Sequence, residues 1–337
     1  MAKSCGATQL GADRFSYPLK RIIFRRISAF VLTTSVFCVS FAQPSKESIE
    51  LAKTIPIADV HMHTYQQNPR SAAWWLEKMD VNNVKWGGAV GDYREDVRAT
   101  LGDRYIPAIG QSEFFRVFFN DGTRGLTNPN NPVFQELYIR GEKLLQSGEV
   151  RGFGEFHTNN SNSGHPKIRR SIRVDNPAMR KFYEIAEKYQ GFIQIHAEFD
   201  IDFERDILSL TADYPNVTTV LSHCLSTSDA TKLASLFSKR KNITCEMSAT
   251  GEVINRLLGL NKSPLAFNSS GPFSNWKKLI EAHSDQIMLG TDPCCGADRG
   301  YSELVSELRA NLLPYFSPEI MEKLAYKNAL RIFKLKE

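Results

Sequence analysis

The segment IADVHMHT, residues 57–64, joins a short apolar run to two histidines that are two positions apart. Side chains at positions i and i+2 of a strand point to the same side, so His61 and His63 would face one way while Val60 and Met62 face the other. Two neutral imidazoles on one side of a strand suit a divalent transition metal. The pair is weak evidence by itself, because surface or core histidines give the same pattern.

The same pattern, an apolar run that ends in a polar residue, recurs along the chain. Eight runs can be counted: Pro56–His63, Val84–Val90, Tyr105–Gly110, Val150–His157, Phe192–Glu198, Thr218–Cys224, Ile243–Ser248 and Gln286–Asp292. Runs rich in Val and Ile are typical of buried parallel strands. Amphipathic helix patterns lie between them, for example from Asn176-Pro177 to Tyr189, with Gly191 just beyond the end.

Strands that alternate with helices predict βαβ units and a parallel sheet. Eight such units within residues 43–337 predict an α/β fold, a single (β/α)8 TIM barrel with its site at the C-terminal ends of the strands. A doubly wound sheet remains the alternative, because periodicity does not show whether a sheet closes.

Composition and charge narrow the class of protein. The 337 residues are 42% hydrophobic and 23% charged, which excludes a disordered, collagen-like or multi-span membrane chain. The net charge of +5 comes from the first 42 residues, since the remainder holds as many acidic as basic residues. The charge therefore predicts no nucleic-acid partner.

The basic cluster Lys20–Arg26 precedes an uncharged run, Ile27–Ala42, which is short for a membrane span. Small residues at Ser40 and Ala42 favour a signal peptide cleaved near Ala42. We therefore expect a signal peptide with an N-terminal extension over 1–42, a barrel domain over 43–337, and a secreted or periplasmic protein without stable membrane association after cleavage. An uncleaved membrane anchor is the alternative.

Four cysteines remain after such a cleavage: Cys224, Cys245, Cys294 and Cys295. This number does not make a disulfide scaffold, although an oxidising compartment would permit one bridge. We expect free thiols at the neighbouring pair Cys294-Cys295.

Polar residues at the ends of four further runs carry the chemistry: Glu155, His196, His223 and Asp292. Each also has a purely structural explanation. A histidine can lie in the core with its hydrogen bonds satisfied, Asp292 can cap a turn before Pro293, and Glu155 can form a salt bridge. The carboxyl ends of barrel strands converge on one face, however, where active sites are built. Together with the HxH pair, these residues make a nitrogen and oxygen set suited to Zn²⁺.

At these positions the chain resembles the amidohydrolase superfamily, in particular the amidohydrolase-related branch of metal-dependent TIM-barrel hydrolases. The resemblance spans roughly residues 55–335. It rests on IADVHMH, IHAE, LSHC and LGTDP at the first, fifth, sixth and eighth runs, and on the closing segment EIMEKLAYKNALRIFKL.

The resemblance implies metal ligation by His61, His63, His196 and Asp292. It implies that His223 binds a second metal or orients the attacking water. Many binuclear members bridge their metals with a carbamylated Lys; Glu155 stands there instead, as in the metal-dependent deoxyribonuclease branch, so one or two ions are expected, with Zn²⁺ as the leading identity. His157 and Glu198, each one pleat beyond a site residue, are expected to contact substrate. His157 as a further ligand is the alternative.

The implied reaction is hydrolysis of a C–N, C–O or P–O bond of a small molecule by metal-activated water. Asp292 would accept and pass on the proton, and His223 would hold the water or the developing oxyanion. Two alternatives remain: a non-oxidative decarboxylase of aromatic or vinylogous acids, and a non-enzymatic binding protein on a retained barrel. The sequence leaves the substrate and the oligomeric state open, a homo-oligomer included.

Overall fold

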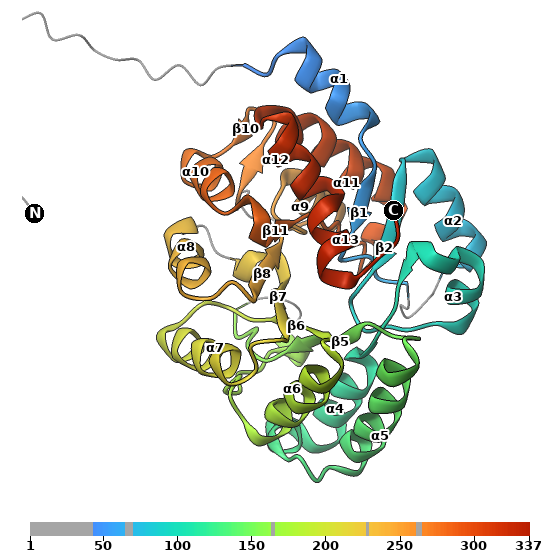
Figure 1. Ribbon diagram of the computed structural model, residues 1–337, viewed down its shortest axis with the longest axis vertical. Coiled ribbons are helices and arrows are strands. Elements are labelled where there is room, and N and C mark those ends of the chain that lie inside the picture. Colours follow the sequence, from blue (N-terminus) through green and yellow to red (C-terminus); the bar gives the residue numbers. More distant parts are fainter. Residues whose placement is uncertain (1–42, 65–69, 163–165, 227–228, 261–264) are drawn as a thin grey trace, which may run out of the picture. The chain divides into compact units, whose positions relative to one another are not determined.

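The computed structural model describes residues 43–64, 70–162, 166–226, 229–260 and 265–337. The predicted signal peptide, residues 1–42, lies outside these described residues and stays a prediction. Within the described part, no helix is both long enough and apolar enough to cross a membrane. From residue 43 onward the chain alternates strands and helices, with the helices arranged outside the strands (Figure 1).

All eight predicted strand positions are occupied. The strands are β1 Ile57–Asp59, β2 Val84–Gly88, β3 Tyr105–Ile106, β4 Ala108–Gly110, β5 Gly152–His157, β6 Phe192–His196, β7 Thr218–Leu221, β8 Ile243–Glu246 and β11 Ile287–Met288, while β9 Phe267–Asn268 and β10 Gly271–Pro272 form a small separate hairpin. Pro107, which has no N–H to donate, separates β3 from β4 within one predicted run.

Most of the strands end earlier than the predicted runs. The first run was expected to stay extended to His63, but β1 ends at Asp59. The last run was expected to reach Asp292, but β11 ends at Met288, and Asp292 has a left-handed φ of 55°. His61, His63 and Asp292 therefore stand beyond the strand ends, which lets their side chains reach one another, whereas Glu155 and His196 lie within β5 and β6.

Apart from the antiparallel β9–β10 hairpin, the strands pair in parallel and in chain order. One sheet has the order β1-β2-β3 and the other β11-β8-β7-β6-β5-β4. The Val60 N–H donates to Leu289 O (3.1 Å) and the Asp292 N–H donates to His61 O (2.9 Å), so the segments after β1 and β11 are also joined. This sequential order is that of a (β/α)8 barrel and excludes the doubly wound alternative, in which the strand order reverses. The predicted α/β fold class is confirmed.

The helices follow the predicted pattern. They are α1 Lys46–Thr54, α2 Ala72–Val81, α3 Glu95–Leu101, α4 Gln111–Thr127, α5 Pro132–Ser147, α6 Pro177–Tyr189, α7 Ile201–Asp213, α8 Ala230–Lys239, α9 Glu252–Leu257, α10 Ser274–Ala282, α11 Tyr301–Glu307, α12 Pro318–Glu322 and α13 Asn328–Phe333. Helix α6 shows why: the Asn176 side chain caps its first turn, Pro177 takes the first helical position, and Gln190 ends it with a left-handed φ.

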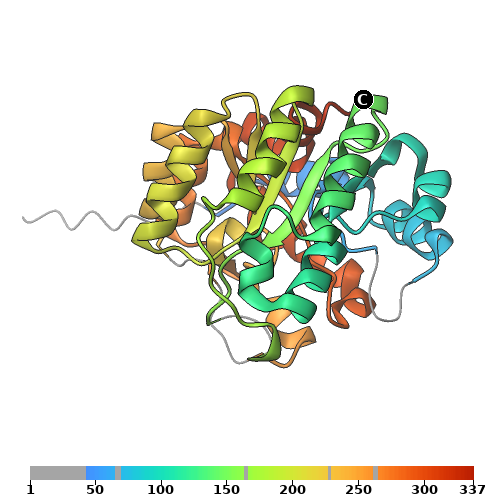
Figure 2. The same ribbon diagram turned by 90° about the horizontal axis from the view of Figure 1, so that it is seen from below.

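Two apolar layers hold this arrangement together. The larger one contains side chains of both the helices and the strands. Figure 2 shows the green helices lying beside the strand of similar colour. The smaller one joins the strands to α13, where the rings of Phe192 and Phe333 meet edge to face at 4.7 Å. Phe192 begins β6, so α13 covers the amino-terminal end of the strands and leaves the carboxyl ends for the polar residues.

Candidate metal centre

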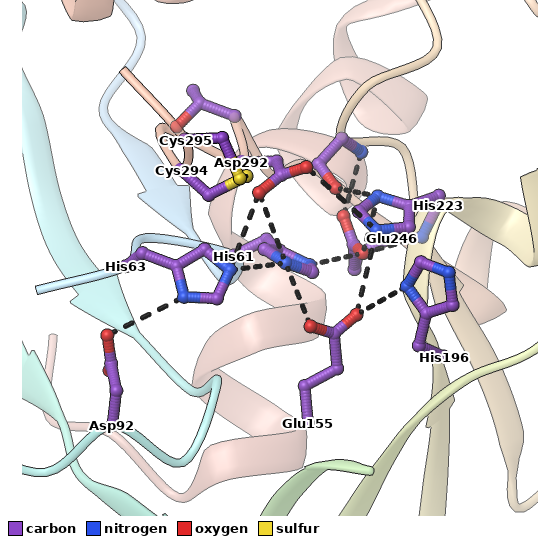
Figure 3. A network of polar contacts seen from close by, with 12 residues as sticks. His61, His63, Asp92, Glu155, His196, His223, Glu246, Asp292, Cys294 and Cys295 are labelled. Carbon is purple, nitrogen blue, oxygen red and sulfur yellow. Dashed lines mark hydrogen bonds and ion pairs between the residues drawn. The ribbon is translucent and has the colours of Figure 1, made fainter. Parts of the chain in front are cut away.

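The polar residues at the strand ends form one compact cluster (Figure 3). His61 is fully buried and Glu155 is 1% exposed, so the cluster lies below the surface. Its members are His61, His63, Glu155, His157, His196, His223 and Asp292. The structure thus brings together all of the residues proposed from the sequence as metal ligands, and one of the two proposed as substrate contacts.

His61, His63 and Asp292 form what we call the β1–β11 half of the cluster. The Nε2 atoms of the two histidines are 3.2 Å apart. Asp292 Oδ1 lies 3.4 Å from His63 Nε2 and 3.7 Å from His61 Nε2. Buried Asp59 fixes the surrounding turns, because its carboxylate accepts the N–H groups of His61 and Thr291. Three ligand atoms therefore converge on one point.

Two further carboxylates lie behind these imidazoles. Glu246 Oε1 is 2.7 Å from His61 Nδ1, and Asp92 Oδ2 is 3.6 Å from His63 Nδ1. Carboxylates in this position fix the tautomer and the orientation of a ligating histidine. With Nδ1 turned to a carboxylate, each ring presents Nε2 to the centre.

Glu246 and Asp92 were not predicted from the sequence. Glu246 is the last residue of β8, the same kind of position that drew attention to Glu155 and His196, and that signal could have found it. Asp92 stands four residues beyond β2, where it forms an isolated β-bridge with Ile109 that no strand pattern in the sequence marks.

Glu155, His157 and His196 form the β5–β6 half of the cluster. Glu155 Oε1 is 3.1 Å from His196 Nδ1, and its Oε2 is 3.1 Å from His157 Nε2. The two imidazoles stack with centroids 4.4 Å apart and planes 7° apart. The Gln111 side-chain amide also donates to Glu155 Oε2 (3.3 Å). The Glu155 carboxylate thus contacts two histidines and accepts a hydrogen bond from one amide.

His223 lies between the two halves. It follows β7 on a turn with a left-handed φ of 53°, and the Glu246 carboxylate accepts its backbone N–H at 2.7 Å. Its Nδ1 is 2.7 Å from Ser248 Oγ. Its Nε2 is 3.6 Å from Glu155 Oε1 and 4.0 Å from Asp292 Oδ2. The ring is therefore placed to act on whatever occupies the space between these carboxylates.

The electrostatics of the cluster follow from this geometry. Burial lowers the pKa of His61, but the carboxylates of Glu246 and Glu155 outweigh it and raise that pKa to about 9. Burial raises the pKa of Glu155, yet the charge of His61 and the hydrogen bonds from His157 and His196 hold it well below its usual range. Burial lowers the pKa of His157 to about 3 against the attraction of Glu155, so this ring is neutral.

The donors fit a divalent ion. Three sets of residues each have ligand atoms within 4.8 Å of one another: His61, His63 and Asp292; His61, Glu155 and His223; Glu155, His157 and His196. Imidazole nitrogens and carboxylate oxygens are the ligands that Zn²⁺ takes in catalytic sites. Ionised carboxylates at this depth are costly without a compensating cation, which is a physical reason for an ion in the cluster.

Glu198 is placed differently. Its carboxylate accepts the backbone N–H of Asn162 at 2.8 Å and the side-chain amide of Asn162 at 2.7 Å. Glu198 therefore fixes the position of Asn162, in the segment that follows β5. Its role as a substrate contact stays a prediction.

The cysteines divide into two pairs. Cys224 and Cys245 form a disulfide between the turn that follows β7 and strand β8, and both are fully buried. Cys294 and Cys295 are free, as expected, and Cys295 is exposed. This disulfide agrees with the expectation that one bridge could form among the four cysteines.

Comparisons with known proteins agree with this fold. A family model described as amidohydrolase matches residues 119–335. Two solved structures, a probable 2-pyrone-4,6-dicarboxylic acid hydrolase from Acinetobacter baumannii and a putative one from Pseudomonas putida, share 13% identity and a TM-score of 0.50 with the chain; they cover 83% and 84% of it and 100% and 99% of their own length. None of the curated proteins compared with the chain matches it.

A third solved structure, 2,6-dihydroxybenzoate decarboxylase from Rhizobium, has 12% identity and a TM-score of 0.46, over 77% of this chain and 87% of its own. The similarity to the two pyrone hydrolases, at 13% identity, concerns the fold, and it leaves the reaction to be argued from the site.

Proposed function

The chain belongs to the amidohydrolase family, and on this premise we propose that it is an exported metal-dependent hydrolase that cleaves a C–N, C–O or P–O bond of a small molecule. The observation that carries the proposal is the β1–β11 half of the cluster. There the Nε2 atoms of His61 and His63 meet Asp292, and Glu246 and Asp92 lie behind the two rings.

In this proposal His61, His63 and Asp292 hold one divalent ion, with Zn²⁺ as the proposed identity. Glu155 would be shared with a second ion, and His196 and His223 would be the other ligands of that ion. A bound divalent ion supplies a Lewis acid and lowers the pKa of water to about 7. Two dications repel strongly, and a shared anionic carboxylate reduces that repulsion.

The protein's own groups would handle the proton and the developing charge. The pKa of Asp292 is held below its usual range, against burial, by the hydrogen bond and charge of the neighbouring histidines, so the carboxylate is ionised, as a proton acceptor must be. With a single ion bound, His223 Nε2, 4.0 Å from Asp292 Oδ2, would instead hold the attacking water or the oxyanion. Ser248 holds the other nitrogen of that ring, which fixes its direction.

Metal analysis of the purified protein, followed by a substrate screen, tests the proposal. We expect at least one tightly bound divalent ion per chain and turnover of a lactone, aryl ester, amide or phosphoester that is lost on chelation. His283→Gln is the matched control, since His283 lies after α10 and contacts Phe237, away from the cluster. Release of CO₂ from a carboxylated aromatic, with no hydrolysis, would favour the decarboxylase instead.

Export is a separate part of the proposal. It is supported by the basic cluster Lys20–Arg26 and the uncharged run Ile27–Ala42. N-terminal sequencing of the exported protein should read Gln43 or a neighbouring residue. An intact N-terminus on protein retained in the cytoplasm would contradict this part and leave the hydrolase proposal untouched.

A further inference from the structure

Two thiols with no role in the proposed hydrolysis lie beside the cluster. Cys294 and Cys295 are adjacent in sequence, and their Sγ atoms are 2.8 Å apart. Figure 3 shows the two side chains next to Asp292, with a sulfur atom turned toward that carboxylate. Cys295 is exposed and Cys294 is partly buried, so the pair can be reached from solvent.

The backbone holds this pair in place. The Cys294 N–H donates to Asp292 O, and the Ala297 N–H donates to Cys294 O, both at 2.8 Å. Cys295 and Gly296 take left-handed φ values of 58° and 97°. The turn therefore brings the two neighbouring side chains together, although neighbours on an extended chain point apart.

A pair of thiols at this separation favours a ligand that takes both sulfurs. Soft centres prefer thiolate ligands, whereas the nitrogen and oxygen donors of the cluster suit a harder ion. Once one sulfur has bound such a centre, the second is already within reach, and linked binding of this kind gains on the order of 10²–10⁴ in affinity. A single exposed thiol would have no such advantage.

We propose that Cys294 and Cys295 form a dithiol site that binds one soft, thiophilic atom, such as trivalent arsenic, at the edge of the metal cluster. With an arsenoxide, two As–S bonds form, the As–O double bond is lost, and the oxygen leaves as water with the two thiol protons. Arsenic stays trivalent, so the reaction requires no oxidant or reductant. The site does not depend on the hydrolase proposal.

Binding of phenylarsine oxide to the full chain, followed by mass spectrometry, tests the site. Cleavage by trypsin after Lys278 and after Arg299 gives a peptide in which Cys294 and Cys295 are the only cysteines. This peptide distinguishes the pair from Cys5 and Cys38. We expect one arsenical on that peptide. It should resist an excess of a monothiol and leave with a dithiol such as 2,3-dimercaptopropanol.

Cys294→Ser and Cys295→Ser are the informative variants, because serine keeps the size of the side chain. Each should bind the arsenical at least ~100-fold more weakly than the wild type, since only one sulfur remains. The proposal is overturned if either variant binds as tightly as the wild type, or if a monothiol releases the arsenical. A peptide two mass units lighter before treatment, which indicates a Cys294–Cys295 disulfide, would also overturn it.

Discussion

The two halves of the cluster use the same residue types in different ways. In the β1–β11 half, His61 and His63 turn their outer nitrogens to carboxylates that lie behind them, Glu246 and Asp92. In the β5–β6 half, both imidazoles contact the single carboxylate of Glu155, which belongs to the half itself. The imidazoles of the β1–β11 half are oriented by carboxylates outside that half, whereas those of the β5–β6 half contact Glu155, a member of the same half.

This difference predicts unequal affinities for metal. An ion entering the β1–β11 half meets nitrogens that are already directed at it, and little has to be reorganised. An ion entering the β5–β6 half has to replace the contacts between Glu155 and its two histidines. We therefore expect a tight ion at His61, His63 and Asp292 and a weaker one that depends on Glu155.

The largest effect should come from His61→Ala. This change removes a ligand of the tight ion and leaves Glu246 buried without its imidazole partner. Metal content should fall by at least one ion per chain, and kcat/KM should fall by more than the roughly 100-fold that loss of an outer-shell partner costs. Metal analysis and steady-state kinetics check this. Full occupancy of both sites in the variant would reject the assignment.

Glu155→Gln should have the next largest effect and separates the two halves. The amide keeps the shape of the side chain but removes the charge that two ions would share. The variant should lose one of two ions per chain and most of its activity while the tight ion stays bound. If the stoichiometry is one ion before and after the change, Glu155 does not bridge.

Glu246→Gln tests the orientation of the β1–β11 half from behind. We expect the affinity for the tight ion to fall by roughly 10–100-fold, because the His61 ring loses the carboxylate that directs it. Competition with a chromogenic chelator measures this affinity. Glu198→Gln, whose partner is Asn162, is the matched control and should leave the affinity unchanged.

The smallest effect concerns the pH dependence of stability in metal-free protein. The pKa of His61 is raised to about 9, so its stabilising contribution is complete below its usual value of 6.5 and is lost as the pH rises through about 9. The pKa of His157, about 3, lies outside this window. The free energy of unfolding should therefore decrease between pH 6.5 and 9. Denaturant titrations of Glu246→Gln should show a shallower decrease, and an unchanged slope would contradict the role of Glu246.

Much of the fold was visible in the sequence because strand and helix periodicity is local. Each of the eight apolar runs became a strand position, and the start of α6 was predicted correctly from Asn176 and Pro177. Its last residue, Tyr189, was also correct, but Gln190 and not Gly191 takes the left-handed φ that ends it. The ends of several strands were not predicted correctly, because the turns after β1 and β11 depend on long-range hydrogen bonds such as that from the Asp292 N–H to His61 O.

The cluster shows the same division. A histidine or carboxylate at the end of an apolar run is recognisable in one sequence, which is why six proposed ligands and His157 could be named. The pairing of Glu246 with His61 joins residues 185 positions apart, and no local pattern encodes it. The same holds for the disulfide, because two cysteines 21 residues apart bond only where β7 and β8 run side by side.

The sequence by itself determined which residue types stand at the ends of the strands, and hence the chemistry available at that face. Only the tertiary structure decided which of those residues contact one another. Their distances depend on the parallel order of the strands and on the turns that follow them, so the contrast between a half oriented by Glu246 and Asp92 and a half centred on Glu155 exists only in the folded chain.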